Sequence, residues 1–327
     1  MKFTKLFLVT LILILAFTFV CNAEDVVLKF GHQYPTDHPH HEGAKYFKEF
    51  VEKRTNNRIK VQIYPNNQLG NSPELWESIQ LGSVDIILCD PGSPSFSDIP
   101  LWDLVMGPFM YRDFDHAFKV AHSPMMEKMY KELEEKVGVT MLEPIWNYGV
   151  RYLTTADTKV ETPEDLKGLK IRTPDIPSFI KAIEVMGGNA TPINFGELYM
   201  ALSQGVVDGQ ENPAGIIYSK KFYEVQDYLM KTGHILSKNA VYMNTSVLEN
   251  LSEEDQQIIK QTIYEAGRYN DKLIEKNEEE MLIKLEELGM KIIELDMEVF
   301  REKAIKGLKE SFNEEELEFF NKVQNIK

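Results

Sequence analysis

The sequence is poor in cysteine, with two in 327 residues. Cys21 lies in an N-terminal hydrophobic stretch that we expect to be removed, which leaves Cys89 alone. A mature chain with a single thiol forms no intramolecular disulfide, even in a compartment that permits one. We therefore expect stability to come from a hydrophobic core in which Cys89 is a free, buried thiol.

Basic residues are outnumbered as well. The chain has 36 Lys and Arg against 51 Asp and Glu, a net charge of −15 at pH 7. Loss of Lys2 and Lys5 with a cleaved leader would leave 34 basic residues and a net charge of −17. Such a surface repels nucleic acid and anionic lipid, so neither is an expected partner.

Long hydrophobic runs are absent after the first 23 residues. That first stretch has Lys2 and Lys5 at its head, an apolar run from Leu6 to Val20 and an end at Ala23. A run of about fifteen apolar residues is short for a membrane span, which needs about twenty. We interpret residues 1–23 as a cleavable secretory signal peptide and expect the mature chain in the periplasm. A lipid anchor at Cys21 is the alternative, but the preceding Phe19 and Val20 are not small.

Recognisable catalytic motifs are missing. The sequence contains no G-x-S-x-G, C-x-x-C, H-E-x-x-H or P-loop, and no G-x-G-x-x-G between a strand and a helix. We therefore expect no enzymatic activity and no cofactor. A secreted hydrolase with paired carboxylates stays an alternative, because an acidic chain also produces such pairs by chance.

What the sequence does contain is an alternation of short apolar segments and amphipathic helices. We predict strands at 26–32, 59–65, 84–90, 151–156 and 169–174, and helices at about 42–55, from a capping Ser72, and after a cap at 162–165. From Ser252 a periodic pattern runs to Gly289 and predicts one long helix, or two joined end to end. This order is typical of an α/β sheet with helices on both faces, in which ligands bind beyond the carboxyl ends of strands.

Four of the seven histidines fall within residues 31–43, GHQYPTDHPHHEG. Zinc binds imidazole, so His38, His40 and His41 could belong to a zinc-binding importer subunit. Pro39 and the adjacency of His40 and His41 make convergence on one ion difficult. We favour a polar loop at a helix start, capped by Asp37 or a neighbour, and expect no metal.

Two arginines and an amide stand in segments punctuated by glycine or proline. Arg151 lies in NYGVRYLTT, Arg172 in DLKGLKIRTP and Asn212 in VDGQENP. A guanidinium binds a carboxylate through two parallel hydrogen bonds, so these residues are candidates for capturing an anion. The alternative is that both arginines pair with surplus carboxylates at the surface.

The segments YPNNQLG, DLKGLKIRTP, TPINFGELYMALSQGVVDGQENP and KFYEVQDYL follow one another as in the solute-binding proteins of tripartite ATP-independent periplasmic (TRAP) transporters, which the chain resembles over nearly its whole mature length. The resemblance implies a periplasmic binding protein with two α/β domains joined by hinge strands and a long spanning helix. It also implies an organic-acid ligand that is delivered to a sodium-coupled membrane permease.

The same resemblance assigns site residues. Arg172 matches the principal carboxylate-binding arginine, Arg151 the second arginine and Asn212 the amide on the same carboxylate, while Phe195 matches an aromatic on the carbon face of the ligand. Gln33, Asn71 and Asp90 match polar contacts to the rest of the ligand. His32 is expected either to hydrogen-bond a hydroxyl or to line the cleft without contact.

The ligand expected from these residues is a sugar acid. Gln33, Asn71 and Asp90 suit hydroxyl groups, and Asp90 would repel a second carboxylate, provided that it points inward rather than capping a helix. A hexuronate such as glucuronate or galacturonate, or an aldonate, therefore fits better than a C4-dicarboxylate or sialic acid, which stay as alternatives. Where the sialic-acid branch has asparagine, aspartate and glutamate, this chain has Gln33, Asn71 and Asp90.

The expected domains follow the same family. Residues 24–148 with about 238–277 would form domain I, and 149–237 with about 278–306 domain II, followed by a C-terminal helix at 307–327. Ligand binding would shift the population toward a closed form. We expect a monomer, with a dimer through the long helix and a role in sensing left open.

Overall fold

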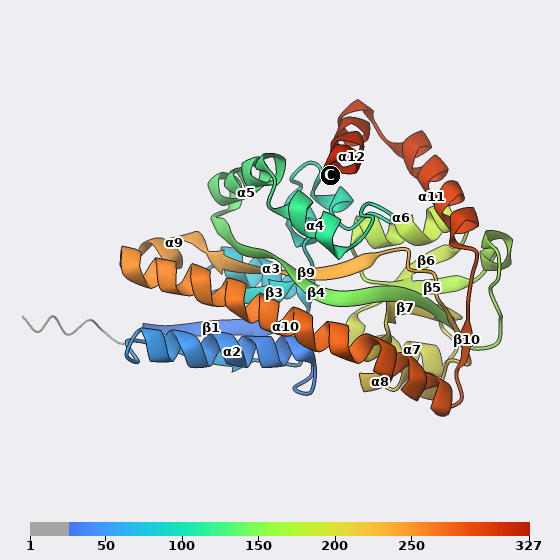
Figure 1. Ribbon diagram of the computed structural model, residues 1–327, viewed down its shortest axis with the longest axis horizontal. Coiled ribbons are helices and arrows are strands. Elements are labelled where there is room, and N and C mark those ends of the chain that lie inside the picture. The colour runs from blue at the N-terminus through green and yellow to red at the C-terminus, as the bar shows by residue number, and fades with distance from the viewer. Residues whose placement is uncertain (1–25) are drawn as a thin grey trace, which may run out of the picture.

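Ten β-strands form one mixed sheet in the computed structural model, which describes residues 26–327 (Figure 1). The predicted signal peptide, residues 1–23, lies outside the described residues. The strands are β1 Val26–His32, β2 Ile59–Tyr64, β3 Ile86–Cys89, β4 Val139–Thr155, β5 Lys170–Thr173, β6 Asn189–Pro192, β7 Gly209–Pro213, β8 Tyr228–Met230, β9 Leu236–Asn244 and β10 Lys291–Ile293. The predicted α/β class is confirmed.

The sheet has the strand order β2-β1-β3-β9-β4-β7-β5-β6, with β8 paired to β4 and β10 to β8. Strands β1, β2 and β3 are parallel, as are β5, β6 and β7, while β9 and β4 are antiparallel to their neighbours. The predicted strand at 151–156 is the end of the 17-residue β4, whose earlier part the sequence prediction missed. Because the strand path is continuous through β9, β4 and β7, the two-domain division stays a prediction.

Helices cover both faces of this sheet. They are α2 Pro39–Arg54, α3 Ser72–Gln80, α4 Phe114–Ala121, α5 Pro124–Val137, α6 Pro177–Met186, α7 Leu198–Ser203, α8 Ala214–Ser219, α9 Thr245–Glu249, α10 Glu253–Glu287, α11 Met297–Ser311 and α12 Glu314–Asn325. Short 3-10 helices occur at Ser93–Ser97, Trp102–Leu104, Pro163–Leu166, Phe195–Glu197 and Phe222–Glu224.

Three helix boundaries differ from the sequence prediction. Asn71, not Ser72, caps α3, because its side chain accepts from the Glu74 amide while Glu74 bonds back to Asn71. Helix α2 begins at Pro39, three residues early, since proline suits the first turn and His38 caps it. The single helix predicted at 307–327 is divided, because Phe312 is extended and Asn313 caps α12.

The predicted long helix is confirmed as the single, continuous α10, which packs on α2, β4 and α8 and crosses the molecule in Figure 1. Its close approach to β4 depends on glycine. A Cβ at Gly267 would lie 2.6 Å from the Trp146 ring, and one at Gly43 of α2 would lie 2.7 Å from the same ring. Trp146 of β4 thus fills a slot between two helices.

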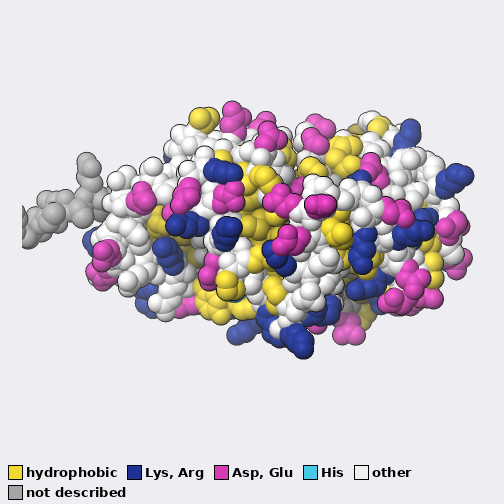
Figure 2. Space-filling model, turned by 90° about the horizontal axis from the view of Figure 1, so that it is seen from above, with side chains coloured by type: hydrophobic (Ala, Val, Ile, Leu, Met, Phe, Trp, Pro, Cys, Tyr) yellow, Lys and Arg dark blue, Asp and Glu magenta, His cyan; other side chains and the backbone are white. Residues whose placement is uncertain are grey.

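The core confirms the expected state of Cys89, which is free and fully buried in β3. Within residues 26–327, no helix has the length and apolar character needed to cross a membrane. On the face shown in Figure 2, acidic and basic side chains are interspersed, with hydrophobic groups visible between them. A mixed surface of this kind is typical of a water-exposed face.

Candidate functional site

A cavity opens where the carboxyl ends of β1, β3 and β5 approach β4, β7 and β9. About 660 Å³ in it, including its open mouth, is free of protein atoms. Seven of the eight residues expected at a ligand site line it: Gln33, Asn71, Asp90, Arg151, Arg172, Phe195 and Asn212. The structure thus gathers segments that are up to 179 positions apart in the sequence, from Gln33 to Asn212.

Arg172, at the end of β5, is 2% exposed and borders the cavity. Its Nε atom donates to the Ile193 carbonyl at 2.8 Å. Its two terminal nitrogens have no hydrogen-bond partner within residues 26–327. Burial lowers the pKa of Arg172 to about 10, against the opposing effect of Glu211, so the side chain stays cationic at neutral pH. A buried cation with unused donors is suited to an incoming anion.

The Phe195 ring forms the neighbouring wall. It lies in the short 3-10 helix Phe195–Glu197, with the Arg172 guanidinium carbon 5.9 Å and the Lys220 Nζ atom 5.1 Å from its centroid. Cations at these distances interact favourably with an aromatic ring. The ring therefore helps to hold Arg172 in place while presenting an apolar surface to the cavity.

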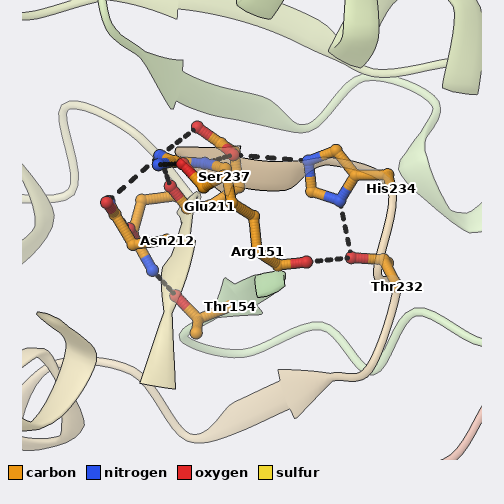
Figure 3. A network of polar contacts seen from close by, with 8 residues as sticks. Arg151, Thr154, Glu211, Asn212, Thr232, His234 and Ser237 are labelled. Atoms are coloured by element: carbon orange, nitrogen blue, oxygen red, sulfur yellow. Dashed lines mark hydrogen bonds and ion pairs between the residues drawn. The ribbon is translucent and has the colours of Figure 1, made fainter. Parts of the chain in front are cut away.

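Arg151 is bound within the protein instead (Figure 3). Its Nε atom donates to a carboxylate oxygen of Glu211, and its Nη2 atom donates to the other at 2.8 Å and to the Glu211 carbonyl at 2.6 Å. Its Nη1 atom donates to Ser237 at 3.3 Å. Arg151 therefore borders the cavity while β7 holds Glu211 against it, and its contact with a ligand carboxylate stays a prediction.

Glu211 is a site residue that the sequence reasoning missed. It is 1% exposed, and the Nε2 atom of His234 lies 3.3 Å from its carboxylate. Burial favours the neutral acid, yet Arg151 and His234 hold the pKa of Glu211 below its ordinary value. Its place beside Asn212 in VDGQENP was the available signal, since an acid inside a buried strand needs a cationic partner.

Asn212 belongs to the same network (Figure 3). Its Oδ1 atom accepts from Arg151 at 3.1 Å, and its Nδ2 atom donates to Gln210 at 2.6 Å. Gln210 in turn donates to Thr154 at 2.9 Å. One amide hydrogen of Asn212 is left for the cavity, so its position fits the expected contact while its oxygen is already used.

Asp90 lies beyond the end of β3 and borders the cavity at 9% exposure. Its Oδ1 atom accepts from the Gly92 amide at 2.8 Å, and the following 3-10 helix has no side-chain cap. The alternative that Asp90 caps this helix is therefore wrong. Burial raises the pKa of Asp90 to about 6, although the Gly92 bond and Lys238 oppose the shift. The carboxyl is thus largely ionised at neutral pH.

Asn71 and Gln33 complete the predicted set at the rim. The Oδ1 atom of Asn71 is used by the helix cap, which leaves its amide nitrogen for other contacts. Gln33 is half-buried beside Tyr34 on the lining.

His32 does not belong to the lining. Its Nε2 atom lies 3.2 Å from Nδ1 of His41, and its Nδ1 atom accepts from the Tyr34 amide at 3.2 Å. Both roles expected for His32, contact and lining, are therefore wrong, because its ring is 1% exposed and both nitrogens are engaged.

His38 and His40 are buried too, so these two do not lie in an exposed polar loop, although the expected helix start is capped by a neighbour of Asp37, His38. His38 and His40 are 3% and 0% exposed and pack against the rings of Tyr34 and Tyr148. Burial lowers the pKa of both His32 and His38 to about 3 and that of His40 well below its ordinary value. Within residues 26–327, no three His, Cys, Asp or Glu side chains converge in a metal-binding arrangement.

Further lining residues escaped the sequence reasoning: Tyr34, Tyr148, Phe179 and Asn239. Phe179 lies with its ring 4.9 Å from the Arg151 guanidinium carbon. Tyr148 precedes Arg151 by three residues in a segment already singled out, so its position gave a signal. Asn239 lies on β9, where nothing in the local sequence distinguishes it.

Comparison with known proteins agrees with this geometry. The model of bacterial extracellular solute-binding protein family 7 (DctP) matches residues 30–315. The chain belongs to this family, the solute-binding proteins of TRAP transporters. The family consists of periplasmic receptors that bind small organic acids and work with membrane permease subunits, and its members are not enzymes.

Two characterised relatives illustrate the range of this TRAP family. The 2,3-diketo-L-gulonate-binding periplasmic protein YiaO of Escherichia coli is 34% identical over 84% of this chain and 83% of its own length. The sialic acid-binding periplasmic protein SiaP of Vibrio cholerae is 32% identical over 88% of each chain.

Solved structures show the same fold. A TRAP solute-binding protein from Roseobacter denitrificans with bound L-galactonate has a TM-score of 0.86 and 30% identity, over 92% of this chain and 99% of that one. One from a Sulfitobacter species with bound β-D-galacturonate has a TM-score of 0.85 and 26% identity, over 91% and 99%. The predicted periplasmic-binding-protein architecture is therefore confirmed.

Proposed function

We propose that this TRAP receptor captures a sugar acid, a hexuronate or an aldonate, with the ligand carboxylate on Arg172. The observation that carries the proposal is the buried Arg172 guanidinium, whose terminal nitrogens border the cavity and have no partner within residues 26–327. A carboxylate would accept two parallel hydrogen bonds there, with the amide of Asn212 beside it.

The charges of the lining favour a monocarboxylate. Arg151 and Glu211 neutralise each other, so Arg172 is the lining cation that has no acidic partner within residues 26–327. Asp90, largely ionised at neutral pH, would repel a second carboxylate across the cavity. A C4-dicarboxylate is therefore disfavoured.

The opposite wall suits hydroxyl groups. The free Asp90 oxygen accepts hydrogen bonds, while Gln33, Asn71 and Asn239 carry amides that border the same space. A polyhydroxy chain or ring can satisfy several of these groups at once. The ligands named for YiaO and for the Roseobacter and Sulfitobacter proteins are sugar acids of this kind, which supports the proposal.

Capture would be coupled to closure of two domains. One wall of the cavity comes from β1 and β3 and the other from β5 and β7, and the two are connected through β4 and β9. A ligand that contacts both walls stabilises the form in which they are close, which is a population shift. We propose that the monomer in this form, with a domain boundary near residues 148 and 238, delivers its ligand to a sodium-coupled permease.

A thermal-shift screen tests the ligand class. Refolded protein, freed of any ligand carried from expression, would be mixed with D-galacturonate, D-glucuronate, L-galactonate, D-gluconate, N-acetylneuraminate, succinate and zinc, with D-galactose as the uncharged control. A ligand at a thousandfold excess over Kd adds about 4 kcal/mol to the free energy of unfolding. We expect stabilisation by a uronate or an aldonate and none by galactose. Stabilisation by succinate or zinc alone would overturn the proposal.

A further inference from the structure

The buried histidines lie behind one wall of the cavity and connect to it through a chain of hydrogen bonds. Tyr34 and Asn239 both line the cavity, and the Tyr34 hydroxyl lies 2.9 Å from the Asn239 Oδ1 atom. The Nδ2 atom of the same amide lies 2.6 Å from Nε2 of His40. All three residues are at most 2% exposed, so water does not compete for these bonds.

The far end of the chain fixes which groups donate. Asn270 of α10 donates through Nδ2 to the Asn147 carbonyl of β4 at 2.8 Å, and that carbonyl can only accept. The Nδ2 atom of Asn270 also lies 3.2 Å from a carboxylate oxygen of Asp271. The orientation of the Asn270 amide is thereby set, with its Oδ1 atom left as an acceptor.

The His40 ring stands between Asn270 and Asn239. Its Nδ1 atom and the Oδ1 atom of Asn270 are both buried, and neither atom has a hydrogen-bond partner within residues 26–327. Burial lowers the pKa of His40 well below its ordinary value, and the nearby Asn270 side chain opposes this effect. A neutral ring beside an acceptor carries its proton on Nδ1, which leaves Nε2 as an acceptor for the Asn239 amide.

We infer that His40 is a positioning residue that orients the Asn239 amide so that Asn239 and Tyr34 together recognise one hydroxyl of the ligand. With Nδ2 donating to His40 and Oδ1 accepting from Tyr34, the second amide hydrogen of Asn239 is a free donor. The Tyr34 oxygen, its proton already used, is a free acceptor. A donor and an acceptor side by side match a hydroxyl group, which both accepts and donates. This inference rests on the proposed sugar-acid function for its ligand.

The tautomer of His40 is directly measurable, with or without a known ligand. In long-range ¹H–¹⁵N spectra of the ¹⁵N-labelled full chain, we expect the His40 ring to be protonated on Nδ1 and unprotonated on Nε2. The signal would be assigned by its loss in His40→Phe, or in Asn239→Leu by its shift if His40→Phe does not fold. A proton on Nε2 would overturn the inference even if sugar acids bind.

Binding measurements test the consequence for the ligand. Titration calorimetry would compare D-galacturonate with its 2-, 3- and 4-deoxy analogues. For the wild type, removal of the recognised hydroxyl should weaken binding about tenfold. In Tyr34→Phe and His40→Phe, the ratio of the Kd of this deoxy analogue to the Kd of D-galacturonate should fall below about threefold. The wall then no longer presents a donor and an acceptor side by side. An unchanged ratio in both variants would overturn the inference.

His41→Phe is the matched control. It removes an imidazole from the same cluster, but His41 contacts His32 and does not border the cavity. Its ratio should equal that of the wild type. If D-galacturonate and the other sugar acids do not bind at all, the proposed function fails, while the tautomer measurement still decides the arrangement of His40.

Discussion

The arginine side and the histidine side of the cavity both bury ionisable groups, and they avoid the cost of burial in opposite ways. On the arginine side, Glu211 balances Arg151 and the charges persist. On the histidine side, His32, His38 and His40 lose their protons and pack as neutral rings. Arg172 is the exception, since its charge is buried without an acidic partner in the described part of the chain, residues 26–327. The contrast indicates that a buried charge without a partner in the protein, such as that of Arg172, is the group that gains most from binding a ligand.

Breaking the compensated pair should have the largest effect. Arg151→Met leaves Glu211 ionised and buried, so we expect the free energy of unfolding to fall by about 3–5 kcal/mol. The double variant Arg151→Met/Glu211→Met should recover most of this loss, because no lone charge remains. Urea unfolding of the wild type, both single variants and the double variant measures the difference. Additive losses would show that the pair is not the source of the effect.

Removing the uncompensated cation should mainly affect binding. Arg172→Ala is expected to weaken affinity for the best sugar acid by about 30-fold to several thousand-fold, or about 2–5 kcal/mol, because the carboxylate is then desolvated without a partner. The affinity of Arg172→Lys should lie between those of the wild type and Arg172→Ala, since lysine keeps the charge but not the paired donors. Calorimetry measures both, with Arg301→Ala of α11 as a control that should bind normally. A loss below threefold would contradict the role of Arg172.

The histidine side predicts a pH dependence of stability. The folded pKa of His32 and His38 is about 3, while their ordinary value is 6.5, so the unfolded chain takes up protons first as the pH falls. Stability is therefore expected to decrease from pH 6.5 toward pH 3, by up to about 1.4 kcal/mol per pH unit for each histidine. Urea unfolding at successive pH values measures the slope.

His38→Phe provides the comparison for that slope. The variant loses the α2 cap and should be less stable at every pH. Its free energy of unfolding should nevertheless change less steeply between pH 6.5 and pH 4.5, because the contribution of one buried histidine is missing. Parallel curves for the wild type and the variant would mean that His38 is not buried in its neutral form.

The smallest effect concerns Asn71 at the rim. Asn71→Ala removes the α3 cap and should lower stability by about 1 kcal/mol, whereas Asn71→Asp keeps the cap and the stability. If the Asn71 amide nitrogen also contacts the ligand, both variants should bind sugar acids less tightly. Calorimetry on Asn71→Asp separates the two roles, because a normal affinity there would restrict Asn71 to capping.

Local sequence signals predicted the elements well and their ends less well. The apolar pattern from Ser252 to Gly289 was sufficient for α10, since a helix of that length depends on its own periodicity. The first part of β4 was missed because its bulges shift the register and its residues are buried on both faces. The start of α2 was misjudged because a histidine, rather than one of the usual capping residues, caps it.

For the site, the motifs located seven of eight predicted residues on one cavity but not what each one does. Arg151 and Arg172 look equivalent in the sequence, yet β7 brings Glu211 to Arg151, whereas the terminal nitrogens of Arg172 have no partner among the described residues. His32 looked suited to a cleft because it lies at the end of β1, but its ring is turned toward His41. Pairing across strands cannot be inferred from local spacing.

The sequence by itself determined the α/β class, the long helix and the TRAP family, because hydrophobic periodicity and contiguous motifs are local properties of the chain. Only the tertiary structure decided the state of the ionisable groups. Whether Arg151 is free, Asp90 borders the cavity or His40 orients Asn239 depends on burial and on partners up to 199 positions away, as between His40 and Asn239. Those energies arise when distant segments are brought together and exclude water, and no single segment carries them.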